Sequence, residues 1–343
     1  MKVTAKDVAQ RAQVSTATVS MVFRNRPGIS EPVRAKVRAA AEELGFSYEG
    51  AAAPVHKSRI IQFIIYKRHG KVVSDTPFFE HLTKGVADEV NALGYQLSIT
   101  YFYGTESAQE QLRSIQTLKC MGIILLTTEM HSADLNVFES LNVPIVLLDN
   151  WFPNKRYNTV VIDNQRGAWY AAHYLIQHGH VRLGYLKSSV EIRNFSERWD
   201  GYLHALSALK DPHNDSAQRI VRVGTTLEAA FEDMSAYLAA DPVLPTAFFA
   251  DNDIIAAGCM RALLKAGYRV PEEISVIGFD DMPICQMLEP KLTTMAVPKE
   301  RMGALAVQRL DQLIRGQTDG EIIRISVFPE IIVRDSVLDL NRK

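Results

Sequence analysis

The chain has 343 residues, with 38 Lys and Arg against 39 Asp and Glu, and hydrophobic residues make up 47% of it. This composition is typical of a globular protein with about two or three folding units, and it excludes the disordered, collagen-like and membrane classes. The net charge of −1 is unevenly distributed, because residues 1–40 carry +6 and the rest of the chain −7. A basic head on an acidic body indicates that the head binds a polyanion.

Nothing in the sequence resembles a targeting or membrane segment. Residues 1–10 contain no apolar run, and no stretch reaches the ~18 apolar residues of a membrane helix. The cysteines lie far apart without metal-ligand spacing. We therefore expect a cytoplasmic protein that has no metal or cofactor and keeps its thiols reduced at Cys120, Cys259 and Cys285.

Three short helices are predicted within residues 1–45, each beginning after a hydroxyl side chain suited to capping: Thr4, Ser15 and Ser30. A tight turn separates the first two helices, and a small apolar core is available to all three. This arrangement predicts a helix-turn-helix unit whose second helix enters the major groove of DNA. A plain three-helix bundle with a solvated basic face is the alternative.

The second helix has two sides. At 100° per residue, Val19, Val22 and Phe23 share the packed side, and Ala17 and Met21 face outward. Hydroxyl, amide and basic groups around this outward side suit contacts with phosphate. The candidate DNA-binding residues in the head are Thr4, Ser15, Thr16, Ala17, Thr18, Ser20, Met21, Arg24, Asn25, Ser30 and Arg34.

Residues 3–46, VTAKDVAQRAQVSTATVSMVFRNRPGISEPVRAKVRAAAEELGF, closely resemble the DNA-binding headpiece of the LacI/GalR family of bacterial transcription regulators. In that family the first residues of the second helix and its sixth residue read bases, which implies this role for Thr16, Ala17 and Met21. The family usually has Arg at the sixth position. Met21 would instead make an apolar contact, such as one with a thymine methyl group, so the family's usual operator is not implied.

Residues 46–58, FSYEGAAAPVHKS, form the predicted hinge or linker. The family's linker makes a small hinge helix whose Leu wedges into the minor groove. In register, Val55 replaces that Leu and Ala52 is the one match. Pro54 falls where an interior helix residue would be, at a cost of ~3 kcal/mol, so the sequence disfavours the hinge helix and leaves Val55 as the candidate wedge.

From residue 59 to 343, apolar runs of strand length alternate with helix-length amphipathic stretches. Continuous Val, Ile and Leu runs separated by helices predict parallel strands buried on both faces. Two such series in tandem predict an α/β core of two parallel-sheet lobes, with a ligand in the cleft at the carboxyl ends of the strands. The runs are residues 60–66, 96–102, 122–127, 145–149, 160–163, 183–186, 220–223, 247–250 and 274–279.

This body resembles the periplasmic-binding-protein-like core of the same family, an effector-binding and dimerisation domain. The landmarks include VVIDNQRGAWYAAHYLIQHGH, RWDGY, PTAFFADND and PEEISVIGFDD. Because the family's chain crosses between its lobes, the resemblance implies a first lobe of about 59–159 and 292–320. The second lobe is then about 160–291 and 321–340.

The resemblance also implies the effector-binding residues Asp149, Arg198, Asn252 and Asp280, which all follow predicted strands or begin helices. Arg offers a planar set of donors, carboxylates accept from hydroxyls and Asn does both, which suits a polyol. Helix capping or turn formation is the alternative for the two aspartates. Phe78 and Phe79 would form a wall of the site or part of the core, and Trp151 has a weaker claim to the same role. At the position after the 220–223 strand where the family often stacks an aromatic ring on the ligand, this sequence has Thr225 and Thr226.

No GxGxxG, Walker, GxSxG or HExxH motif marks an enzyme, and His178 and His180 at a predicted helix end favour a structural role. We therefore predict a ligand-responsive repressor of carbohydrate-metabolism genes. A homodimer would bind a pseudo-palindromic, double-stranded operator, and a sugar or sugar phosphate would act as effector. The alternative is a cytoplasmic sugar-binding or sugar-processing protein without a transcriptional role, which would lack a salt-sensitive affinity for duplex DNA.

Overall fold

The computed structural model describes residues 3–23, 28–46, 59–73, 77–207, 209 and 219–342. The chain divides into two units, residues 1–58 and 59–343. Five positions singled out in the sequence lie outside the described residues: Arg24, Asn25, Ala52, Pro54 and Val55. The structure therefore does not bear on the hinge helix.

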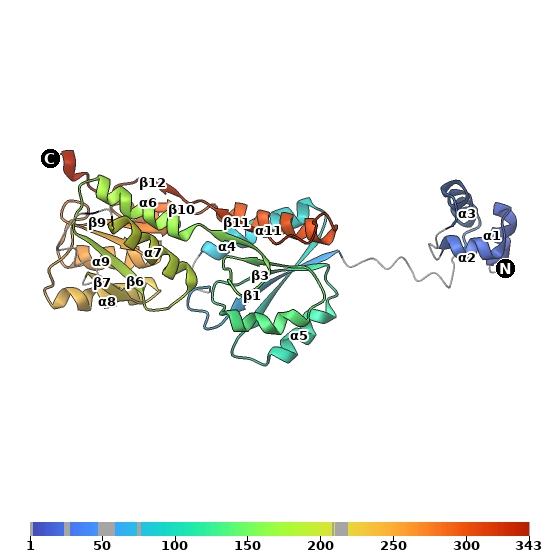
Figure 1. Ribbon diagram of the computed structural model, residues 1–343, viewed down its shortest axis with the longest axis horizontal. Helices are drawn as coiled ribbons and strands as arrows, with labels where there is room; N and C mark the ends of the chain where they lie inside the picture. Colours follow the sequence, from blue (N-terminus) through green and yellow to red (C-terminus); the bar gives the residue numbers. More distant parts are fainter. Residues whose placement is uncertain are drawn as a thin grey trace. The chain divides into compact units, whose positions relative to one another are not determined.

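The first unit contains the three predicted helices (Figure 1), which are α1 Ala5–Ala12, α2 Thr16–Phe23 and α3 Glu31–Glu43. Their shared core includes Val8, Val19 and Val37, each fully buried. Gln13 ends α1 in the left-handed conformation, at φ 53°, which makes the tight turn before α2. The unit is thus a helix-turn-helix fold.

The predicted caps are present at two of the three helix starts. The Ser15 hydroxyl accepts a hydrogen bond from the Thr18 backbone N–H at 3.0 Å. At α1, the Asp7 carboxylate accepts from both the backbone N–H and the hydroxyl of Thr4, each at 2.7 Å. Ser30 stands at the N-cap of α3, but its side chain makes no capping hydrogen bond.

The second unit forms two six-stranded sheets from its described residues, in the orders β11-β5-β4-β3-β1-β2 and β12-β10-β9-β8-β6-β7. Every pairing is parallel except the antiparallel pair of β10 and β12. The first sheet contains β1 Ile60–Lys67, β2 Gln96–Tyr103, β3 Gly122–Leu126, β4 Ile145–Leu148, β5 Asn158–Ile162 and β11 Arg324–Val327. The second contains β6 Leu183–Ser188, β7 Ile220–Val223, β8 Ala247–Ala250, β9 Ser275–Asp280, β10 Thr293–Ala296 and β12 Glu330–Ile332.

Helices pack on both sheets and complete two lobes. On the first sheet, α11 crosses α4 so closely that a Cβ at Gly85 would collide with the Glu300 carbonyl. In the second lobe, α9 packs on β6, β8 and β9, and α6 packs on α7. The helices are α4 Phe78–Ala92, α5 Ala108–Thr117, α6 Asn164–Gln177, α7 Arg193–Leu206, α8 Leu227–Ala239, α9 Asp253–Lys265, α10 Ile284–Met287 and α11 Lys299–Ile314, with 3-10 helices at Ser132–Ser140 and Leu340–Arg342.

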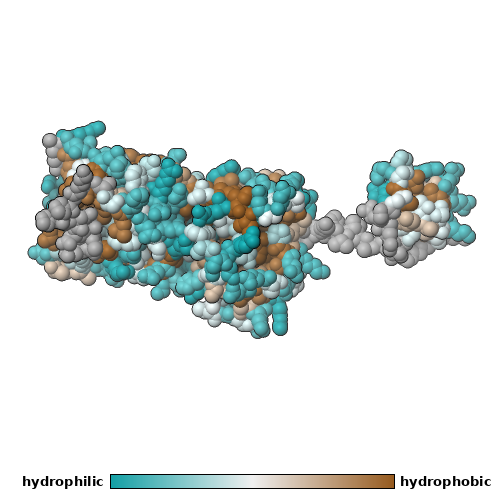
Figure 2. Space-filling model, viewed as in Figure 1, coloured by the Kyte–Doolittle hydropathy of each residue, from teal (hydrophilic) through white to brown (hydrophobic). Residues whose placement is uncertain are grey.

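All nine predicted strands are present. The inner strands β3, β4 and β8, for example, are buried throughout, whereas the outer strand β2 is mostly exposed or half-buried. The predicted fold class is confirmed: a helix-turn-helix headpiece and an α/β core of two lobes. Among the described residues, no helix is both long and apolar enough to cross a membrane. The face of the molecule in Figure 2 is mostly hydrophilic, with apolar patches between.

The predicted lobe boundaries are wrong in three places. Residues 160–162 belong to β5 in the first sheet, not to the second lobe. Residues 293–296 form β10 of the second sheet, and 324–327 form β11 of the first, so each lies in the lobe opposite to its prediction. The reason is that the chain crosses between lobes at the ends of these strands, near Asp163, Val297 and Phe328, rather than before them.

Candidate functional site

A cavity lies between the two lobes at the carboxyl ends of their strands. All six predicted effector-binding residues line it. Its volume is about 20 Å³, which is room for about one water molecule. The first lobe contributes Val72, Phe78, Phe79, Thr128 and Asp149, and the second contributes Ile192, Asn194, Phe195, Arg198, Asn252 and Asp280.

Arg198 is the central buried cation of this site. Its Nη2 donates to Asp280 Oδ1 at 3.0 Å, its Nη1 to the Asp251 carbonyl at 2.5 Å and its Nε to Asn164 Oδ1 at 2.9 Å. The guanidinium carbon also lies 3.8 Å from the centre of the Phe279 ring. These contacts hold the guanidinium in one orientation, as a rigid donor surface requires.

Asp149 provides hydrogen-bond acceptors to the same cavity, whereas Arg198 provides donors. It follows β4 with φ 73°, and the Thr128 hydroxyl donates to its Oδ2 at 2.6 Å. Its Oδ1 is buried and has no hydrogen-bond partner within the described chain. Burial raises the pKa of this carboxyl to about 7, although Thr128 and Arg198 oppose the shift. An unpaired buried acceptor of this kind is suited to a donor that a ligand brings.

Asn252 and Asp280 have roles in the fold as well as in the site. Asn252 caps α9, where its Oδ1 accepts from the Ile255 N–H at 2.9 Å, so its amide nitrogen is left to donate. Asp280 has φ 109° and pairs with Arg198. Burial raises the pKa of Asp280, and the charges of Arg198 and Lys299 oppose that rise. Both predicted alternatives, turn formation and ligand contact, are therefore compatible at Asp280.

The aromatic residues divide into two groups. Phe78 and Phe79 line the cavity and also belong to the core of the first lobe, with ring centres 5.1 Å apart. Trp151 is not among the lining residues. Its indole N–H donates to Glu197 at 3.0 Å, and its ring lies between the guanidinium groups of Arg193 and Arg324.

Five lining residues were missed by sequence reasoning. Thr128 stands two residues after β3, so the rule that ligands gather at strand ends would have found it. Val72 lies in the loop after β1, and no local pattern marks it. The other three, Ile192, Asn194 and Phe195, surround the start of α7 and reach the cavity only through the packing of that helix.

The candidate DNA-binding surface lies on α2. Thr16 and Ala17 are exposed, and Thr18, Ser20 and Met21 are half-buried on the outward side. The hydroxyls of Ser15 and Thr18 are hydrogen-bonded to each other, and the Thr4 hydroxyl donates a hydrogen bond to the Asp7 carboxylate. Arg34, predicted to donate to phosphate, is instead buried, and its Nε donates to the Ile29 carbonyl at 3.2 Å, so that it holds the turn before α3.

The two histidines at the end of α6 have structural partners. His178 Nδ1 lies 2.8 Å from the Tyr174 carbonyl. The ring nitrogens of His180 lie 3.0 Å from the Thr246 hydroxyl and 3.1 Å from the Leu338 carbonyl. These contacts fasten the end of α6 to the second sheet and to the C-terminal segment, in agreement with the predicted structural role.

Comparisons with known proteins agree with both units. Residues 4–48 match the family of bacterial regulatory proteins of lacI type, and residues 172–337 match the periplasmic-binding-protein-like domain. The chain is 30% identical to an HTH-type transcriptional repressor PurR of Haemophilus influenzae, over 97% of this chain and 98% of that one. It is 32% identical to a PurR of Pectobacterium atrosepticum, over 98% of this chain and 97% of that one.

Solved structures share the whole architecture. The complex of the transcriptional regulator CelR with cellobiose has a TM-score of 0.72 and 26% identity, covering 98% of this chain and all of that one. The lac repressor dimer bound to operator and the anti-inducer ONPF has a TM-score of 0.71 and 22% identity, with the same coverage. The relatives are transcriptional repressors, which confirms the prediction that the chain is not an enzyme. This chain belongs to the LacI family and is a ligand-responsive transcriptional repressor that binds operator DNA through its helix-turn-helix unit.

Proposed function

We propose that this repressor controls genes of carbohydrate metabolism and takes a sugar or sugar phosphate as its effector. The observation that carries the proposal is the pairing of a fixed guanidinium, Arg198, with a buried acceptor that lacks a partner, Asp149 Oδ1, around one cavity. A polyol carries hydroxyls that both accept and donate, which matches this set and the amide of Asn252. The cellobiose complex of CelR supports the same class of ligand.

The size of the cavity bears on how the effector acts. At about 20 Å³ it is far too small for a sugar, so binding requires the lobes to separate or their side chains to move. An effector that fits only the wider arrangement favours that arrangement by its difference in affinity. We propose that this preference changes the operator affinity of the headpieces.

A thermal-shift screen tests the ligand class. Sugars, sugar phosphates and nucleobases are added singly to the purified full-length protein. A ligand at 100 times its Kd stabilises the folded state by about 2.7 kcal/mol, which raises the melting temperature measurably. We expect sugars or sugar phosphates to produce this rise. Stabilisation by nucleobases alone would assign the site to a base instead.

A homodimer is proposed on the evidence of the outer strand β2. Tyr101 is 49% exposed, and Ile99 and Tyr103, which alternate with it on the same face of the strand, are also exposed. The Lys67 ammonium lies 4.6 Å from the centre of the Tyr101 ring. A row of large apolar side chains at a sheet edge suits burial against a second copy of the chain. The dimer in the lac repressor structure supports this assembly.

Tyr101→Glu is expected to convert the dimer to a monomer, because a charge would be buried at the centre of the proposed interface. Operator affinity should fall by at least ~100-fold, since one headpiece then reads one half-site without its mate. Analytical ultracentrifugation and operator titration measure the two effects. Val243→Glu, at an exposed position of the second lobe, is the matched control and should remain dimeric. A dimeric Tyr101→Glu protein would contradict the proposed interface.

Met21→Arg is expected to change the preferred base at one position of each half-site. The proposed apolar contact of Met21 with a thymine methyl would be replaced by the donors of Arg, which favour guanine. The half-buried position leaves room for the longer side chain to extend outward. Selection from randomised half-sites measures the preference, and Met21→Leu should keep that of the wild type. The same selected sequences for Met21→Arg and wild type would remove Met21 from base reading.

A further inference from the structure

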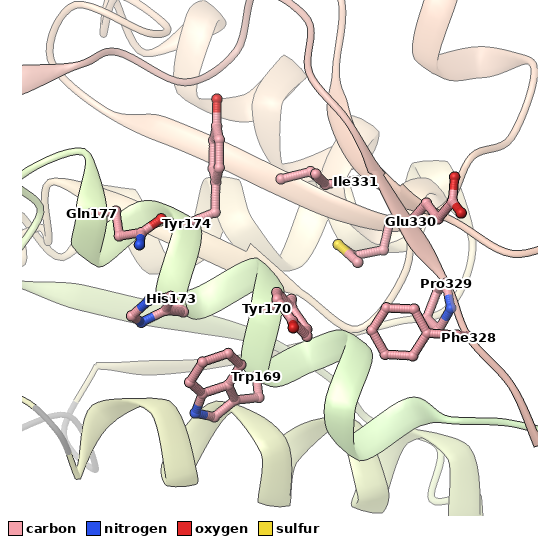
Figure 3. Close-up of a pocket in the computed structure, with 10 residues that line it drawn as sticks. Trp169, Tyr170, His173, Tyr174, Gln177, Phe328, Pro329, Glu330 and Ile331 are labelled. Atoms are coloured by element: carbon pink, nitrogen blue, oxygen red, sulfur yellow. The ribbon is translucent and has the colours of Figure 1, made fainter.

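A second cavity lies in the second lobe, outside the cleft that we assign to the effector. Its volume is about 550 Å³, which is within the usual size of small-molecule sites. Figure 3 shows Trp169, Tyr170 and Tyr174 projecting from α6, and Phe328 and Ile331 on the segment that faces the helix. Neither operator binding nor the effector cleft uses these residues.

Aromatic rings form much of the wall of this cavity. Tyr170 is 40% and Phe328 39% exposed, and their ring centres are 5.5 Å apart at 85°. The Arg166 guanidinium lies 4.7 Å from the centre of the Phe328 ring, so this ring already makes a cation–π contact within the protein. Neighbouring aromatic rings that remain this open offer stacking and cation–π contacts to an occupant.

The polar groups that line the cavity disfavour a negatively charged ligand. Glu330 is the one charged residue among the described residues that line it, and its carboxylate has no ion-pair partner in the described structure. The His173 ring stacks on Trp169 at 4.6 Å, and its buried Nδ1 has no hydrogen-bond partner there. The nearby cation, Arg166, lies against the rings of Tyr170 and Phe328 and is not among the lining residues, so an anion in the cavity would meet the Glu330 carboxylate and the negative faces of the rings.

The cavity is also built on the connections between the lobes. Phe328 and Pro329 form the connection from β11 to β12, and α6 begins directly after the connection at Asp163. The two connections are joined, because the Asp163 N–H donates to the Val327 carbonyl at 2.9 Å. A Cβ at Gly167 would collide with the Pro329 ring, so α6 packs directly against the connecting segment.

We infer that this cavity is a second ligand site, which takes an aromatic ring compound that carries no negative charge. The rings of α6 and Phe328 stack on the ligand, and Glu330 accounts for the selection against anions. The ligand touches the connection between the lobes at Phe328 and Pro329, so it binds at that connection and not in the cleft. The site does not depend on the class of the cleft effector.

Indole, tryptamine and indole-3-acetate test the inference, since they share one ring and differ in charge. Ligand-observed NMR titrations of the full-length protein should give a Kd of about 1 mM or tighter for indole and tryptamine. Indole-3-acetate should bind at least tenfold more weakly. Phe328→Ala removes part of the wall and Ile331→Trp fills the cavity, and each should weaken indole binding at least tenfold. Met287→Ala, at a side chain that is 80% exposed and outside the cavity, is the matched control.

Three results would overturn the inference: no binding of indole or tryptamine up to about 10 mM, tighter binding of indole-3-acetate, or wild-type affinity in both cavity variants. The charge series needs only the wild-type protein, so it decides the matter even where a variant folds poorly. A negative sugar screen would count against the proposed effector class and leave this site intact. Unchanged indole binding in Arg198→Ala would show that the probe does not occupy the cleft.

Discussion

Arg198→Ala is expected to abolish the response to effector while the protein still binds its operator. The substitution removes three hydrogen bonds that orient the donor surface of the cleft, to Asn164, Asp251 and Asp280. A hydrogen bond to a charged group contributes about 1.5–3 kcal/mol, so if two further N–H groups of Arg198 bind the effector as proposed, their loss weakens effector binding at least ~100-fold. Removing one partner of a buried ion pair also destabilises a fold by about 3–5 kcal/mol.

Fluorescence anisotropy of labelled operator, with and without the sugar that stabilises the wild type, measures the response. Arg309→Ala is a matched control, because Arg309 is also buried and its Nε donates to Asn158 at 2.9 Å, far along the first lobe in α11. It should lose stability and keep the response. A normal response in Arg198→Ala would remove this residue from the effector site.

Asp149→Asn is expected to make the protein more stable at neutral pH and less sensitive to pH. Burial raises the pKa of Asp149 from 3.8 to about 7, so the folded state binds this proton more tightly than the unfolded state does. Its contribution to the free energy of unfolding therefore falls as pH rises from about 4 to about 7, and is constant above that. The cost at neutral pH is on the order of 4 kcal/mol, and the neutral amide avoids it.

Urea unfolding at pH 5 and pH 8 measures this effect. The gain in stability from Asp149→Asn should be larger at pH 8. The other buried carboxyls are present in both proteins, so their contributions cancel in the difference between the two free energies of unfolding. Sugar affinity should fall at least ~10-fold, since the unpartnered acceptor is lost. Asp253→Asn is the matched control: burial also raises the pKa of Asp253 to about 7, but this residue does not line the cavity. An equal gain at both pH values would contradict the raised pKa.

Much of the fold could be predicted because buried parallel strands leave continuous apolar runs. The strand β3, for instance, is five apolar or glycine residues, all buried. The strands β10, β11 and β12 were missed, because their short sequences, TTMA, RISV and EII, contain polar residues and form no continuous apolar run. Their sheet membership depends on pairing between strands that lie far apart in the sequence, such as Ile325 beside Val160, which no local pattern encodes.

The site was predictable to the extent that its residues follow strands. Asp149 and Asp280 stand at the carboxyl ends of β4 and β9, where parallel sheets place their ligands. The small size of the cavity was not predictable, since it depends on how side chains from both lobes, such as Phe78 and Phe195, come to line the same space. The burial of Arg34 was likewise missed, because helical spacing gives the side of a helix but not what the preceding turn covers.

The narrow cleft also sets a time scale. On the proposed effector role, a ligand reaches Arg198 only after the lobes separate or the side chains around the cavity move, so the rate of binding cannot exceed the rate of that opening. The rate of effector binding therefore reaches a plateau as the effector concentration rises, and the height of the plateau equals the rate of opening.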